Sequence, residues 1–112
     1  MTRRVLGEIE HQILLAILCR ESESYSVQIV MELERRTGRQ VATSAVFIAL
    51  NRLQRRGLLK DRLAEAGEEG AHRRRYFRLT LLAMEMIRES RRAYLSLWEG
   101  CQALLDDGGG RR

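Results

Sequence analysis

Apolar residues recur every three or four positions through the first part of the chain, which is the spacing of an amphipathic helix. This pattern predicts a first helix from Val5 to Arg20. A second helix is expected from Val27 to Thr37, with Ser26 placed to act as its N-cap. A third is expected from Ser44 to Arg56, with Thr43 as its N-cap.

The third predicted helix has two distinct faces. Its core side is expected to carry Val46, Leu50 and Leu53, with Phe47 and Ala49 flanking them. The opposite side carries Ser44, Ala45, Ile48, Asn51, Arg52 and Arg55. A short helix that has one apolar face and one polar, basic face can pack on a core and still present side chains to a partner.

After the third helix the apolar positions begin to alternate, which is typical of strands. Two strands are expected, from Leu58 to Glu65 and from Arg73 to Leu79, joined by a glycine-containing tip at 66–71. Thr80 is then placed to cap a long helix that is predicted to reach Leu105. So small a domain cannot bury the whole apolar stripe of this helix, and its far half is therefore expected to pair with a second copy of the chain.

These elements predict a mainly α fold with a β-hairpin. A helix that leads directly into a basic hairpin suggests a winged helix-turn-helix, in which one helix enters the DNA major groove and the hairpin lies along the phosphates. The expected organisation is a DNA-binding domain at 1–80, a dimerisation helix at 81–105, and a tail at 106–112 whose composition is typical of disorder.

The distribution of charge supports a DNA-binding function. The chain has 20 Lys and Arg, 15 Asp and Glu, and a net charge of +5. Residues 1–34 carry −3, residues 35–78 carry +8, and residues 79–112 carry 0. Because the excess positive charge falls on the helix and hairpin, double-stranded DNA is the expected partner. The alternative is a winged helix that binds protein and not DNA, which would not need such a concentration of positive charge.

Several other classes of function have no support in the sequence. Cys19 and Cys101 fall within apolar helical patterns and are expected to be reduced and structural; with His11 and His72 they are too widely separated to form a metal site. No run of eighteen or more apolar residues and no signal peptide is found, so a cytoplasmic protein is expected. No phosphate-binding loop or catalytic set has a recognisable spacing, and neither an enzyme nor a cofactor is expected.

The expected contacts with DNA come from the third helix and from the base of the hairpin. They are Thr43, Ser44, Ile48, Asn51, Arg52, Arg55, Arg73, Arg74 and Arg75. Arg52 and Arg55 could read guanine edges or only contact phosphate, and phosphate contacts are the commoner kind. Asn51 could pair with adenine or be merely solvated, and Ile48 could contact a thymine methyl group or help to cover the core.

Four segments together resemble the PadR family of bacterial transcriptional regulators. They are LGEIEHQILLAIL, YSVQIVMELERRTG, SAVFIALNRLQRRGLL and RRRYFRLT, and the resemblance runs from Leu6 to about Ile87. The single C-terminal helix resembles the shorter members. The resemblance implies a homodimeric winged-helix repressor whose paired recognition helices bind an inverted-repeat operator. It also implies that some members release DNA when a small, often aromatic, molecule binds at the dimer interface.

Trp98 is the only tryptophan and lies within the predicted dimerisation helix. It could pack between the two C-terminal helices, as a buried aromatic residue commonly does. Alternatively, as the family resemblance suggests, it could stack on a flat effector in a cavity between the subunits. Tyr94 and Cys101, about one turn to either side, are the expected walls of that effector site.

Overall fold

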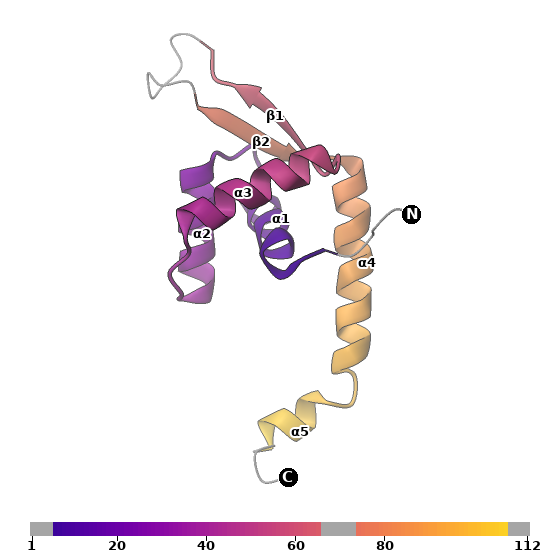
Figure 1. Ribbon diagram of the computed structural model, residues 1–112. Coiled ribbons are helices and arrows are strands. Elements are labelled where there is room, and N and C mark those ends of the chain that lie inside the picture. Colours follow the sequence, from indigo (N-terminus) through magenta and orange to yellow (C-terminus); the bar gives the residue numbers. More distant parts are fainter. Residues whose placement is uncertain (1–5, 66–73, 108–112) are drawn as a thin grey trace.

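A computed structural model of the protein describes residues 6–65 and 74–107. The hairpin tip expected at 66–71, Arg73 and residues 108–112 of the expected tail lie outside the described residues. Within the described parts of the chain, three helices are followed by a two-stranded hairpin and two further helices (Figure 1). Their bounds are α1 Glu8–Arg20, α2 Ser26–Thr37, α3 Thr43–Arg55, β1 Leu59–Leu63, β2 Arg75–Leu79, α4 Leu81–Trp98 and α5 Gln102–Asp106. The mainly helical fold with a wing and a long C-terminal helix is confirmed.

The first helix begins later than the expected Val5. It begins at Glu8, and Gly7 is the N-cap residue. The backbone N–H of Gly7 donates a hydrogen bond of 2.9 Å to Oε1 of Glu10. A glutamate three residues into the helix therefore satisfies the backbone donor at its start, and the apolar spacing before Gly7 is not part of the helix.

Neither hydroxyl residue predicted to cap α2 and α3 does so. Ser26 and Thr43 are the first residues within their helices, while Tyr25 and Ala42 occupy the N-cap positions. At Tyr25 the backbone N–H donates to Oε1 of Gln28 at 3.1 Å. Because a side chain inside the helix serves this donor, α2 can begin without a hydroxyl at its N-cap.

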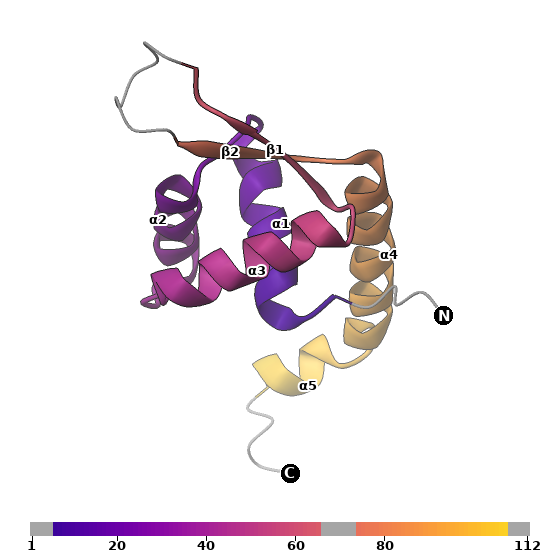
Figure 2. The same cartoon turned by 45° about the horizontal axis from the view of Figure 1, so that its top comes forward.

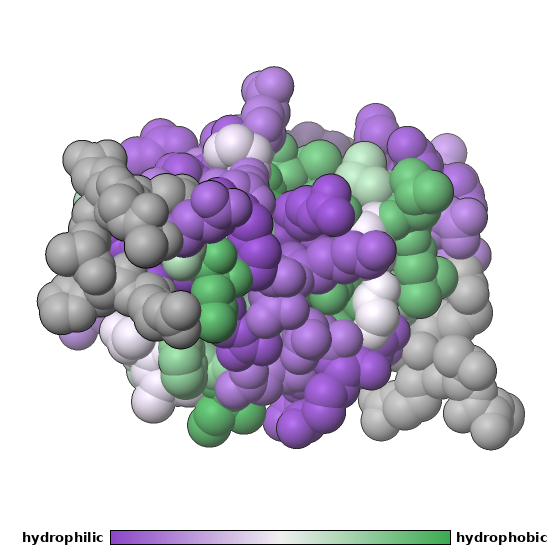
Figure 3. All heavy atoms as spheres, turned by 90° about the horizontal axis from the view of Figure 1, so that it is seen from above, coloured by the Kyte–Doolittle hydropathy of each residue, from purple (hydrophilic) through white to green (hydrophobic). Residues whose placement is uncertain are grey.

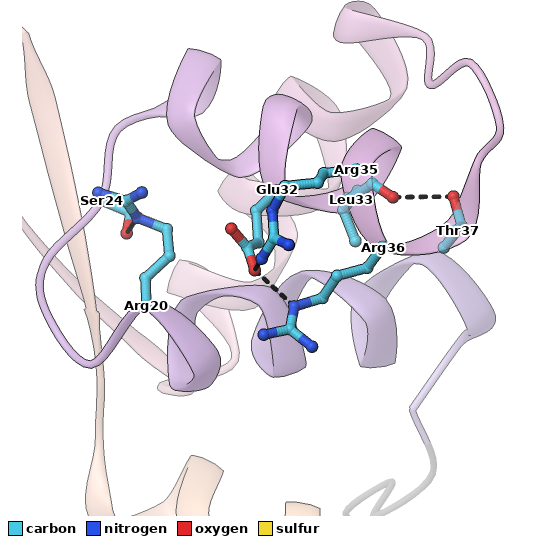
Figure 4. Close-up of polar contacts among 7 residues, drawn as sticks. All are labelled: Arg20, Ser24, Glu32, Leu33, Arg35, Arg36 and Thr37. Carbon is cyan, nitrogen blue, oxygen red and sulfur yellow. Dashed lines mark hydrogen bonds and ion pairs between the residues drawn. The ribbon is translucent and has the colours of Figure 1, made fainter.

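The predicted C-terminal end of α2 is confirmed. Gly38 has a φ of +71°, the left-handed conformation that ends many helices. In the last turn, the Thr37 hydroxyl donates a hydrogen bond of 2.8 Å to the carbonyl of Leu33 (Figure 4). Gly57 likewise has a φ of +78°, just after α3. The two glycines therefore mark the ends of α2 and α3.

The wing is an antiparallel pair in which Leu59 faces Leu79 and Leu63 faces Arg75. Its strands are shorter than the sequence predicts. Ser24, in the loop between α1 and α2, adds one bridge to the edge of β2. The Ser24 N–H donates to the Phe77 carbonyl at 3.0 Å, and the Phe77 N–H donates to the Ser24 carbonyl at 2.8 Å. The wing is thereby tied to the helical body, and Phe77 is fully buried in its core.

The core lies between α1, α2 and α3, the inner side of the wing and the first part of α4, and α3 crosses α1 and α2 beneath the wing (Figure 2). Val46, Leu50 and Leu53 of α3 are fully buried, as predicted. The prediction for Phe47 is wrong, because this side chain is 51% exposed. Residues 46, 49, 50 and 53 already fill the arc of α3 that meets the core, so position 47 is turned outward with Ile48.

The long C-terminal helix begins as predicted and ends early. The Thr80 hydroxyl caps it by accepting a hydrogen bond of 3.1 Å from the Ala83 N–H. It ends at Trp98 and not at Leu105, because the chain turns through Gly100, which has a φ of +83°. The last residues form α5, so Asp106 is helical and does not belong to the expected tail. Beyond Ser90 every described residue is exposed, and this part of α4 extends past the helical body (Figure 1).

The two cysteines, which fall within apolar helical patterns in the sequence, lie at the surface. Both Cys19 and Cys101 are exposed. Cys19 lies two residues after the buried Ile17, which turns it to the solvent side of α1. Cys101 lies beyond Ser90, where no described part of the chain covers the surface.

Candidate nucleic-acid interface

One side of α3 is exposed along its whole length. The exposed residues of this side are Thr43, Ser44, Phe47, Ile48, Arg52 and Arg55. Ser44, Ile48 and Arg52 are four residues apart, so they form one row along the helix. Ile48 is 58% exposed, which excludes the alternative that it covers the core. This row, with Thr43, Phe47 and Arg55 beside it, is called the α3 face below.

The basic segment is less available for a partner than its charge count suggests. Arg35 and Arg36 both turn toward Glu32 on the same helix (Figure 4). The hydrogen bond from Arg36 is the largest cause that holds the pKa of Glu32 below its ordinary value. These two arginines therefore share one carboxylate within α2, which offsets one of their two positive charges.

Three further arginines of this segment pair with acids from distant parts of the sequence. Arg56 pairs with Glu10, Arg62 with Glu23, and Arg75 with Asp61. Among the residues that the structure describes, the basic side chains of the segment without an ion pair are Arg39, Arg52, Arg55, Lys60 and Arg78. The Arg74 guanidinium lies over an aromatic ring. Two of the unpaired arginines, Arg52 and Arg55, lie on the α3 face.

The sequence grouped Arg74 with Arg75, but these two side chains lie on opposite faces of the wing. The Arg74 guanidinium lies 4.3 Å from the centre of the Tyr25 ring. Tyr25 in turn meets Tyr76 edge to face, and Arg62 lies 4.7 Å from the centre of the Tyr76 ring. This stack joins the wing to the loop before α2, on the side away from α3.

Arg75 points the other way and is held against α3 by three acceptors. Its Nε donates to Oδ2 of Asp61 and its Nη1 to Oδ1 of Asn51, each at 2.7 Å. Its Nη2 donates to Oε1 of Gln54 at 3.3 Å, and Nε2 of Gln54 donates to Oδ1 of Asp61 at 3.3 Å. These four residues are called the Arg75 cluster. Gln54 and Asp61 were not predicted to belong to the site; the one available signal was an acid inside a strongly basic segment.

The face of the molecule that carries the wing is largely polar. Seen from this side, hydrophilic residues cover most of the middle of the molecule, with apolar patches near its edges (Figure 3). In the strand register Lys60 lies directly opposite Arg78, so two positive charges are neighbours on the outer side of the wing. Like charges in such a pair repel each other, which an anionic partner would relieve.

The expected effector residues lie at the end of α4. Trp98 is 40% exposed and borders a hollow of about 450 Å³ between the end of α4 and α5. Leu95, Gln102 and Ala103 also line the hollow, whereas Tyr94 and Cys101 do not. Within a single chain, therefore, Trp98 has an open space beside it, and the two expected walls lie outside that space.

Two general features complete the picture of the described residues. None of the helices in these parts of the chain is long and apolar enough to cross a membrane. The same residues contain no group of three or more His, Cys, Asp or Glu side chains that could hold a metal ion.

Comparison with known proteins agrees with this geometry. The Clostridium difficile R20291 PadR family transcription regulator covers 90% of this chain and 97% of its own, at 18% identity and a TM-score of 0.70. A PadR-like transcriptional regulator from Bacillus cereus covers 87% of this chain and 90% of its own, at 21% identity and a TM-score of 0.72. A PadR family transcriptional regulator from Eggerthella lenta covers 83% of this chain and 80% of its own, at 22% identity and a TM-score of 0.68.

The TM-scores show that these proteins share the fold of this chain. No curated protein matches the chain at a significant level. The family model of the PadR-like transcriptional regulators, which are not enzymes, matches residues 14–89. That match covers most of the chain, from the middle of α1 through the wing to α4. The protein therefore belongs to the PadR-like family of transcriptional regulators.

Proposed function

We propose that the protein is a repressor that binds an inverted-repeat operator in double-stranded DNA as a homodimer. The observation that carries this proposal is the α3 face, where two arginines without ion partners lie beside exposed serine, threonine and isoleucine side chains. An α-helix fits the major groove, in which each base pair presents a distinct pattern of donors and acceptors.

The residues of the α3 face differ in what they can contribute. Arg52 and Arg55 can neutralise phosphates or donate two hydrogen bonds to guanine. Ile48 projects an exposed apolar side chain suited to a thymine methyl group. Thr43 and Ser44 lie in the first turn of α3, where backbone N–H groups and hydroxyls favour a phosphate. Arg74 lies on the outer face of the wing, and it would contact the phosphate backbone of DNA only after losing its contact with the Tyr25 ring.

The homodimer is proposed from the surface of the C-terminal helices. Past Ser90 the chain exposes a series of large apolar side chains: Tyr94, Leu95, Leu97, Trp98, Leu104 and Leu105. Monomeric proteins rarely leave such a contiguous patch in water, whereas a second copy of α4 would bury it. A two-fold dimer would present two α3 faces to half-sites about 34 Å apart, one turn of the DNA helix.

Repression and release by an aromatic effector rest on the family resemblance. The open space beside Trp98 supports the effector part of this proposal, since a flat ring could stack there. Packing of Trp98 against a second subunit is the competing role. In the dimer, a ligand would weaken DNA binding only by favouring one arrangement of the two α3 faces over another.

The test is fluorescence anisotropy on a duplex selected from a random pool, measured over a range of salt concentrations. Arg52→Ala and Arg55→Ala should each weaken binding, and each lost phosphate contact should change the slope of log K against log salt by about one. The matched control is Arg35→Ala. It removes a charge from the same basic segment, but this charge is already paired with Glu32. It should leave affinity and slope unchanged.

The result also separates the two classes of function. Salt-dependent binding to random duplex DNA, weakened by the α3 variants and not by the control, supports a DNA-binding regulator. A chain that is folded and dimeric but binds no duplex even at low salt would instead act by binding protein. Equal effects of all three variants would mean that net charge alone, and not the α3 face, drives binding.

A further inference from the structure

We infer that Arg75 is a positioning residue of the DNA interface, which acts by masking the negative charge of Asp61 and not through a phosphate contact of its own. This role rests on the proposed binding of α3 in the major groove. It differs from the phosphate contact that the sequence predicts for Arg75, and it accounts for an acidic residue within the most basic part of the chain.

Asp61 places a carboxylate beside the surface that is proposed to meet DNA. It lies on β1, and its Oδ1 accepts a hydrogen bond of 3.3 Å from Nε2 of Gln54 on α3. Gln54 directly precedes Arg55 of the α3 face. A helix with its side chains is about 10–12 Å across, and charges in physiological salt interact over a Debye length of about 8 Å. A free negative charge at this position would therefore repel the phosphates that approach the α3 face.

Arg75 cancels this charge within the folded chain. Its Nε donates to Oδ2 of Asp61 at 2.7 Å, and the two side chains are only 29% and 28% exposed. A partly buried pair is screened by salt less than a fully exposed one. The guanidinium also lies 4.8 Å from the centre of the buried Phe77 ring, a favourable position for a cation. The pair therefore presents no net charge to DNA.

The same guanidinium ties the wing to α3. Its Nη1 donates to Oδ1 of Asn51 at 2.7 Å, and its Nη2 donates to Oε1 of Gln54 at 3.3 Å. Arginine has five N–H donors, and three of those of Arg75 are thus engaged by β1 and α3. Moving the guanidinium to a phosphate would break these hydrogen bonds and uncover the carboxylate. While it stays, its remaining N–H groups add little attraction for DNA, because its positive charge is already offset.

Removing Arg75 alone should therefore harm DNA binding through Asp61. The carboxylate would then lie unpaired beside the phosphates, and like charges that face each other across an interface are strongly unfavourable. We expect Arg75→Met to weaken binding to a selected duplex and to random duplex DNA by about tenfold or more. Removing both charges should restore binding, because the repelling group is lost with its partner.

The experiment is fluorescence anisotropy with the full chain, comparing wild type, Arg75→Met and the double variant Arg75→Met with Asp61→Asn. The double variant should bind within about threefold of wild type, which would show that the two residues act as a unit. A double variant as weak as Arg75→Met would mean that Arg75 acts on DNA directly. Arg75→Lys keeps a cation beside Asp61 and should retain most of the affinity; a loss equal to that of Arg75→Met would overturn the masking role.

Salt dependence separates masking from a merely structural role. The affinity lost in Arg75→Met should shrink as salt is raised, because repulsion between charges is screened. A misplaced α3 would instead weaken binding by the same factor at every salt concentration. The matched control is Arg62→Met, which makes the same change in net charge and breaks the ion pair with Glu23 on the side of the wing away from α3. It should weaken binding far less, and an equal loss would overturn the inference.

A direct contact is tested by replacing single phosphates of the selected duplex with uncharged methylphosphonates. Wild type and the double variant should be weakened at the same phosphates and by the same factors. A phosphate whose replacement weakens wild type but not the double variant would be a contact made by Arg75, and it would overturn the masking role.

The outcomes also separate this role from the proposed function. Circular dichroism checks that each variant is folded. If Arg75→Met does not fold, the double variant still decides: affinity and phosphate dependence equal to those of wild type support masking, and weaker binding overturns it. Binding by wild type that the double variant does not match overturns this role alone. A wild-type chain that binds no duplex overturns the proposed function and, with it, this role.

Discussion

Replacing Arg56 with methionine should destabilise the protein strongly, because it leaves a buried carboxylate without its cation. Glu10 is only 4% exposed, and Nη1 of Arg56 donates to its Oε1 at 2.9 Å. The Gly7 N–H donates to the same oxygen, while Oε2 is buried and has no hydrogen-bond partner. This pair joins α1 to the residue that follows α3, so its loss would also loosen the end of α3.

The size of the effect follows from the burial of the two side chains. Removing one partner of a buried ion pair costs about 3–5 kcal/mol, and the Arg56 side chain is 24% exposed, so water can approach from one side. We therefore expect a loss of about 3 kcal/mol in the free energy of unfolding. Arg35→Ala is the control, since it breaks a surface pair with Glu32 and should destabilise the protein far less than Arg56→Met.

The assay is urea unfolding followed by circular dichroism, at fixed protein concentration because the proposed dimer makes stability depend on concentration. The double variant Glu10→Gln with Arg56→Met removes the charge as well as its partner. It should recover about 2 kcal/mol relative to Arg56→Met alone, because an uncharged amide costs less to bury. If Arg56→Met cost no more than the control, or the double variant were no more stable than the single one, the buried-charge explanation would be refuted.

Three further predictions concern the dimer, the effector and pH. Light scattering should give twice the monomer mass of 13.0 kDa, and a chain ending at Ser90 should be monomeric; a monomeric full chain would remove the two-fold operator model. Planar aromatic acids should quench the Trp98 fluorescence at micromolar concentration and weaken operator binding; quenching without weaker DNA binding would make the hollow incidental, and Trp98→Ala is the control. Burial lowers the pKa of His11 from 6.5, so as the pH falls the unfolded chain binds a proton at His11 before the folded chain does, and the free energy of unfolding should decrease below pH 6.5. Unfolding curves of His11→Gln should show a smaller decrease in stability over this pH range. An equal decrease would mean that His11 is not the group responsible.

The order and type of the elements up to α4 could be predicted from the amino-acid sequence. Apolar spacing of three or four residues placed α1, α2 and α3, and the change to alternation placed the wing. Gly38 and Gly57 marked the ends of α2 and α3 because positive φ is accessible to glycine, and Thr80 marked the start of α4 by its hydroxyl. These signals are local, since each depends on a few neighbouring residues, and so they can be recognised without a fold.

Which charged residues are available to a partner depends on how the chain folds. Residues 35–78 carry a net charge of +8 in the sequence. In the structure, however, Arg62 is paired with Glu23, 39 positions away, and Arg75 with Asp61, 14 positions away. The sequence predicted that Arg74 and Arg75 contact DNA together at the base of the wing, whereas their side chains lie on opposite faces of the wing. Such pairings depend on how α3, the wing and the α1–α2 loop meet in space. No local pattern contains that information, because the partners become neighbours only when the core has formed.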